Sequence, residues 1–180
     1  MKGSMKTSLA VACVVAGLAL FSFSAFAQQG GPDMVGPDFN LVPAITADQA
    51  VQIVKSEMHK LDVGKFWMWR GPRGDVKAKV ALTLDGRIVS QLELNPSTDD
   101  ILARGQGVFV TQTTADRDRA VSKVQEVVPN LQPVAARMTP DGEWKVELAL
   151  GGAVVAEIDV NSRDGAVITD WGASREATLY

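Results

Sequence analysis

The sequence predicts an α+β fold made of two tandem α-β-β-β units, in which each helix packs on its own small antiparallel sheet. The first observation is an internal repeat. The segment DVKAKVALTLDGRIVSQLELN at 75–95 aligns without a gap on DGEWKVELALGGAVVAEIDVN at 141–161, at a constant offset of 66. The second observation is that each copy alternates apolar and polar residues, as strands with one wet face do, and follows an amphipathic helix.

The first 27 residues are predicted to be a secretory signal peptide rather than part of the fold. Lys2 and Lys6 give the positive start, 9–23 is apolar or small, and the pattern AFA at 25–27 places cleavage after Ala27. The apolar run is shorter than the ~20 residues of a membrane helix, so we expect no stable membrane span after cleavage. Either Met1 or Met5 is a compatible start. The expected location is the periplasm or the extracellular medium.

Charge and cysteine content restrict the function classes. The mature chain carries 16 basic and 21 acidic residues, a net charge of −5. This mildly acidic surface gives no electrostatic basis for binding nucleic acid. Cys13 is the only cysteine and leaves with the signal. We therefore expect no disulfide, no thiol nucleophile and no cysteine-bound metal in the mature protein.

The mature chain is predicted to start with a Gly/Pro-rich leader at 28–45, which is either an extended tether or a segment that docks through Phe39 and Leu41. The first unit then covers 46–104. Its helix is predicted over 47–60, because TADQ at the start fits a capping box.

Three strands follow the first helix, over 65–70, 76–84 and 88–94. In the middle strand, Lys77 and Lys79 fall on the predicted wet face, opposite a row of apolar residues. The dipeptide DG at 85–86 predicts a two-residue type I′ turn, which requires positive φ at both positions.

The second unit is predicted over 114–171, after a connector at 105–113 that has an edge strand as one alternative. Thr114 or Asp116 caps a helix over 116–128, and Pro129 ends it. The strands are expected over 134–138, 144–150 and 154–160, followed by a C-terminal tail at 172–180.

The two copies differ in length by four residues. The two helices match at an offset of 70, whereas the last two strands match at 66, so the first unit holds four extra residues in or near 65–74. This is also where the two copies differ most in sequence.

The second unit carries a recognisable strand-end pattern, EIDVNSRDGAV at 157–167, preceded by WKVEL at 144–148. A helix followed by a three-stranded meander that ends in this way resembles the PepSY domain. The first unit departs from the pattern, because Asp99 stands where the second unit has Gly165, and Ala78 replaces the aromatic residue. The resemblance implies an exported domain of a family for which a peptidase-modulating role has been proposed. It brings no catalytic residue.

The string WMW at 67–69 is the most unusual local feature. On a strand, Trp67 and Trp69 share one face and the intervening residues on the other face are also apolar, so something must cover each face. The second unit or the leader is one candidate cover, and a peptide groove is the other. Arg70 and Arg73 follow at a basic hairpin tip. These four residues are the candidate binding residues.

No catalytic residue, cofactor or metal site is predicted. His59, the only histidine, lies near the end of the first helix, where an exposed cation is favoured by the helix dipole. One histidine without a second His or Cys is a poor transition-metal site. The sequence contains no nucleophile elbow, calcium loop or phosphate loop.

These observations predict a non-enzymatic exported binding or regulatory protein of the bacterial envelope, which engages a polypeptide and has a peptidase as one candidate partner. A self-associating structural component of the envelope is the alternative. A small-ligand or metal carrier is a third interpretation. The sequence leaves the oligomeric state open.

Overall fold

The computed structural model describes residues 42–180, so the predicted signal peptide and most of the predicted leader lie outside the described residues. Two antiparallel three-stranded sheets and three α-helices form an α+β fold, as predicted. The first sheet has the order β1-β2-β3 and the second the order β4-β5-β6. The elements are α1 (Ala47–Glu57), β1 (Asp62–Arg70), β2 (Val76–Leu84), β3 (Arg87–Leu94), α2 (Arg117–Val127), β4 (Gln132–Met138), β5 (Glu143–Leu150), β6 (Ala153–Asn161) and α3 (Trp171–Leu179).

The helix starts follow the predicted capping chemistry. The Gln49 amide donates to the Thr46 hydroxyl (3.2 Å), and the Thr46 amide donates to the Gln49 side chain (2.7 Å), which confirms the capping box. Asp116 caps α2 by accepting from two backbone amides. Both helices continue into a single 3₁₀ turn before the first strand of the following sheet.

The strands confirm the predicted pairings, with small differences at their ends. Asp85 and Gly86 have φ values of 50° and 76°, which confirms the type I′ hairpin turn between β2 and β3. The apolar row of β2 faces the main core, which includes Ala78, Val80 and Leu82. The connector at 105–113 forms no strand, although its Val108 carbonyl accepts a hydrogen bond from Val76 N (2.9 Å).

Backbone hydrogen bonds repeat at the offset of 66. Leu102 N donates to Glu93 O, and Ile168 N donates to Asp159 O, each at 2.8 Å. The turns that precede these bonds are also equivalent. Asp99 adopts a φ of 59° where Gly165 has 75°, so the aspartate holds a left-handed conformation that favours glycine.

The four extra residues of the first copy lengthen one hairpin. The turn that closes it has the same bond in both copies, from Gly71 N to Asp75 O and from Thr139 N to Glu143 O, each at 2.8 Å. The pairs Met68–Ala78 and Met138–Trp144 are equivalent in the two copies. In the β4–β5 hairpin the turn follows this pair directly, whereas in the β1–β2 hairpin two further pairs, Trp69–Lys77 and Arg70–Val76, come before the turn. Two of the four extra residues, 69–70, therefore lie within 65–74, as predicted. The other two, 76–77, lie on the partner strand.

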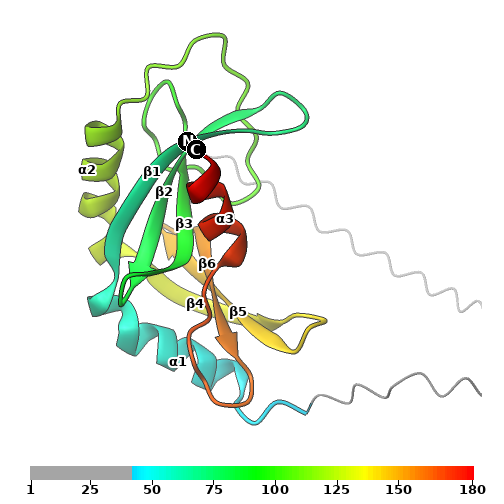
Figure 1. The fold of residues 1–180 in the computed structure, drawn as a ribbon. Coiled ribbons are helices and arrows are strands. Elements are labelled where there is room, and N and C mark those ends of the chain that lie inside the picture. The colour runs from blue at the N-terminus through cyan, green and yellow to red at the C-terminus, as the bar shows by residue number, and fades with distance from the viewer. Residues whose placement is uncertain (1–41) are drawn as a thin grey trace, which may run out of the picture. The chain divides into compact units, whose positions relative to one another are not determined.

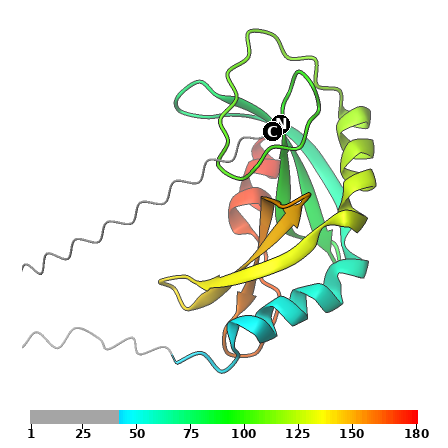
Figure 2. The same ribbon diagram turned by 180° about the vertical axis from the view of Figure 1, so that it is seen from behind.

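The helices pack on the opposite sheets. Figures 1 and 2 show α1 lying along β4, and α2 lying beside β1. The Trp144 indole donates to Ile45 O (3.1 Å), and Ile53 of α1 touches Gly165 after β6. The prediction that each helix packs on its own sheet is therefore wrong. The inner faces of both sheets share one hydrophobic core with both helices, which buries more apolar surface than a three-stranded sheet with one short helix can bury alone.

The predicted C-terminal tail at 172–180 is also wrong, because most of it forms α3. Asp170 caps this helix by accepting from Ala173 N (2.8 Å). Figure 1 shows α3 in front of the strands of the first sheet, on the face opposite the shared core. No helix within residues 42–180 is long and apolar enough to cross a membrane.

Candidate functional site

Two of the four candidate binding residues, Trp67 and Trp69, lie on the outer face of β1–β3, the face that also carries Lys77, Lys79 and Ala81. Period-2 alternation places these side chains together, opposite the shared core. Helix α3 covers this face and makes a second apolar cluster, separate from the main one, in which Trp67 and Ala81 pack with Ala173 and Ala177. The prediction that something must cover this face of the tryptophans is right, but the cover is the C-terminal helix.

Polar contacts fix α3 at one position on the outer face. The Glu176 carboxylate accepts from Lys79 Nζ (2.7 Å) and from Trp67 Nε1 (3.4 Å). Lys65 Nζ donates to the carbonyl oxygen of Ala177 near the end of the helix, where a cation also complements the helix dipole. The small alanines bring α3 close to the sheet, and the carboxylate aligns it along the sheet.

The two lysines on the outer face are buried, contrary to the prediction of a wet face. Lys77 is 7% exposed and Lys79 is 3% exposed. Lys77 Nζ pairs with Glu93 (2.6 Å), and Lys79 Nζ lies 3.6 Å from the same carboxylate and 4.5 Å from the centre of the Trp69 ring. A buried ammonium needs such partners, because removing it from water without them is costly.

The structure separates the four candidate residues. Trp67 is 2% exposed and is a core residue of the α3 cluster, so it cannot contact a ligand while α3 is docked. Trp69 is half-buried on the same face. Arg70 and Arg73 are exposed, with Arg70 on the opposite side of the strand and Arg73 in the hairpin turn. Trp69 is therefore the only one of the four that lies at the edge of the covered face.

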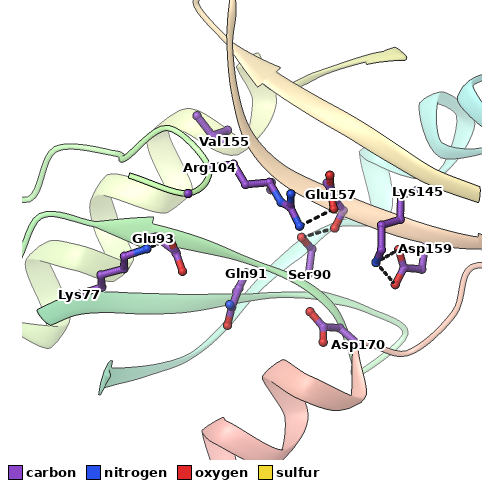
Figure 3. A pocket seen from close by; sticks show the side chains of 12 residues that line it. Lys77, Ser90, Gln91, Glu93, Arg104, Lys145, Val155, Glu157, Asp159 and Asp170 are labelled. Carbon is purple, nitrogen blue, oxygen red and sulfur yellow. Dashed lines mark hydrogen bonds and ion pairs between the residues drawn. The ribbon is translucent and has the colours of Figure 1, made fainter. Parts of the chain in front are cut away.

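A polar cleft adjoins this face where β3 meets β6. Its volume is about 360 Å³ and Figure 3 shows the side chains around it. Lys145 pairs with Asp159 (2.7 Å), and the buried Glu157 pairs with both Arg104 (2.7 Å) and Arg137 (3.1 Å). We call this polar cleft the seam cleft. No motif or spacing pointed to the residues of this cleft, because they come together only when the two sheets meet.

The polar groups of both surfaces are largely paired with one another. Most acidic groups of the seam cleft are paired with a base, and its one hydroxyl, that of Ser90, donates to Glu157 O (2.6 Å). His59 is exposed in the 3₁₀ turn after α1, as predicted. Within residues 42–180, no group of three or more His, Cys, Asp or Glu side chains is arranged to hold a metal ion.

Sequence reasoning missed the residues of α3 that complete the outer face. A signal was present, because Asp170 can cap a helix, and Ala173 and Ala177 are spaced to share one helical face with Glu176 beside them. Comparisons with models of protein families, with curated proteins and with solved structures found no match to this chain.

Proposed function

We propose that this chain is a non-enzymatic exported protein that binds a polypeptide segment on the outer face of β1–β3. One observation supports the proposal most: this face already holds a helical segment, α3, through contacts that select both shape and charge. This is helix-in-groove recognition within one chain. A partner segment with the same chemistry would take the place of α3.

The chemistry of that partner follows from the contacts of α3. Small side chains four residues apart fit against Trp67 and Ala81, as Ala173 and Ala177 do. A carboxylate beside them meets the buried ammonium of Lys79. A free ligand therefore needs a helix with a small-residue stripe and one acidic residue on the same face.

The packing of α3 favours displacement. Its buried side chains are alanines, whereas Trp171 and Leu179 remain 75% and 69% exposed. Because burial of large side chains supplies most docking energy, a helix held by alanines is held weakly. A partner that adds larger apolar contacts at the rim, beside Trp69, gains affinity over α3.

The proposal also includes the origin of the fold and its family. The element order, the repeated hydrogen bonds and the offset of 66 support two tandem α-β-β-β units that arose by duplication and exchanged their helices. The strand-end pattern supports a PepSY-like family. On that resemblance a peptidase is the first partner to test, and the envelope is the expected location.

The binding face can be tested with α3 itself as the probe. In the full mature chain, Ala177→Asp places a carboxylate against Trp67 and undocks α3. A labelled synthetic peptide of residues 170–180 should then bind the Ala177→Asp chain and not the wild type, measured by fluorescence anisotropy. Arg175→Asp, an exposed change on the same helix, should leave α3 docked and block the peptide. Failure of the peptide to bind a folded Ala177→Asp chain would contradict the proposal.

Self-association is the second candidate function, and the position of α3 favours it. Because α3 packs in a cluster of its own, separate from the shared core, it can dock on a second copy by the same contacts, which is domain swapping. Light scattering of the mature chain over a wide concentration range distinguishes the two functions. A monomer at the highest concentration excludes the exchange.

A further inference from the structure

The seam cleft joins two equivalent positions of the two copies. Arg104 N donates to Val154 O (2.8 Å), and Asp170 N donates to Ile88 O (2.8 Å). Residues 104 and 170 correspond at the offset of 66, and so do residues 88 and 154. The two hydrogen bonds are therefore counterparts. One position carries a guanidinium and the other a carboxylate. From this geometry we propose that the seam cleft binds a zwitterion, an α-amino acid or a dipeptide with free ends.

The Arg104 side of the cleft carries a guanidinium with free donors, because Glu157 is also held from outside the cleft by Arg137. Two guanidiniums, those of Arg104 and Arg137, share the single carboxylate of Glu157, whose side chain is 7% exposed. The side chain of Arg104 is 51% exposed and uses one nitrogen for this pair, so other N–H donors remain for a ligand. The buried carboxylate holds the two guanidiniums in place, and a ligand carboxylate would meet donors already positioned.

The Asp170 side of the cleft has surplus negative charge. Among residues 42–180, the carboxylate of Asp170 accepts from Ala173 N (2.8 Å) and forms no salt bridge. Figure 3 shows Asp170 reaching the cleft from the start of α3, and Arg104 reaching it from the other side. A ligand ammonium would supply the missing cation.

The residues between the two sides add no net charge. Lys77 pairs with Glu93, and Lys145 pairs with Asp159. Gln91 lines the cleft, and its Oε1 is buried without a hydrogen-bond partner in the described structure.

The charge separation selects a ligand that carries both charges. A simple anion would meet the uncompensated Asp170 carboxylate, and a simple cation would meet the Arg104 guanidinium. A zwitterion places each charge against its opposite. Arg104 and Asp170 are not among the groups on which α3 docks, although Lys77 lies on both surfaces and Asp170 caps α3. Glycylglycine binding is measured with α3 docked and peptide binding with α3 undocked, so the two proposals are tested separately.

The test uses the full mature chain and glycylglycine as the probe. Amide resonances of residues 88–93, 104–105, 154–159 and 170 should shift in ¹H–¹⁵N spectra and saturate by about 10 mM ligand. Acetylglycylglycine and glycylglycinamide each lack one charge. Both should bind about tenfold more weakly or worse, since each loses one charge-assisted contact.

Two variants assign the charges to residues. Arg104→Gln and Asp170→Asn should each weaken binding by about tenfold, and asparagine keeps the helix cap. Arg117→Gln and Asp141→Asn, both exposed and outside the cleft, should bind as the wild type does. The proposal is overturned if glycylglycine causes no shifts at the cleft, if the capped peptides bind equally well, or if the cleft variants match the two controls.

Discussion

Replacement of Gly165 by alanine tests whether α1 packs on the second sheet. Gly165 has a φ of 75°, and a left-handed conformation costs a residue with a Cβ about 1–2 kcal/mol. The new Cβ would also lie 2.7 Å from Cδ1 of Ile53 in α1, and such overpacking costs about 1–3 kcal/mol. Gly165→Ala should therefore destabilise the protein by about 2–5 kcal/mol. Gly74→Ala is the control, because Gly74 has a φ of 83° and no atom within 4 Å of its Cβ position.

A double-mutant cycle isolates the contact between Gly165 and α1. Ile53→Val removes the Cδ1 that the new Cβ meets, and alone it should cost about 0.5–1.5 kcal/mol. In combination with Gly165→Ala it should relieve the overlap, giving a favourable coupling of about 1 kcal/mol or more. Urea unfolding of the four proteins measures the free energies. If the two changes are additive, and Gly165→Ala costs no more than Gly74→Ala, α1 does not pack at Gly165 and the reasoning is refuted.

Three further predictions concern the outer face. Trp67→Ala should cost about 3–5 kcal/mol in chemical denaturation, whereas the half-buried Trp69→Ala should cost clearly less; equal losses would contradict the assigned burial. Glu176→Gln weakens the pair with the buried lysine beneath it and should cost about 1 kcal/mol, with faster amide exchange in α3 as the specific readout. Deletion of 69–70 together with 76–77 should leave a cooperative fold with the same hairpin turn, seen in cross-strand amide NOEs, because these four residues are two complete pairs.

Local patterns in the sequence were enough to predict α1, α2 and the six strands, although not α3. Alternation defined the strands, the Thr46 cap defined the start of α1, and Asp85-Gly86 defined a turn. The partner of each helix was not predictable in this way. An apolar stripe shows that a helix must be buried, but both sheets offer equivalent inner faces, so the choice between them depends on how the two copies meet.

The outer face shows why the binding residues were only partly predicted. Trp67 was correctly placed on a face that needs a cover, yet its cover, α3, has alanines as its buried residues and its large apolar side chains in solvent. That pattern is weakly amphipathic and does not stand out. The lysines looked solvated because the helix that covers them, with Glu176, lies far away in sequence, although Glu93 is on the neighbouring strand.

Native-state hydrogen exchange tests whether α3 is a separable occupant of a binding face. Because α3 packs in its own cluster, apart from the shared core, it should open without the sheets. Amides of residues 173–179 should exchange with a free energy at least about 2 kcal/mol below that of β2, whose amides report global unfolding. If the α3 amides exchange only with global unfolding, at the same free energy as β2, α3 is an integral part of the fold and the claim is contradicted.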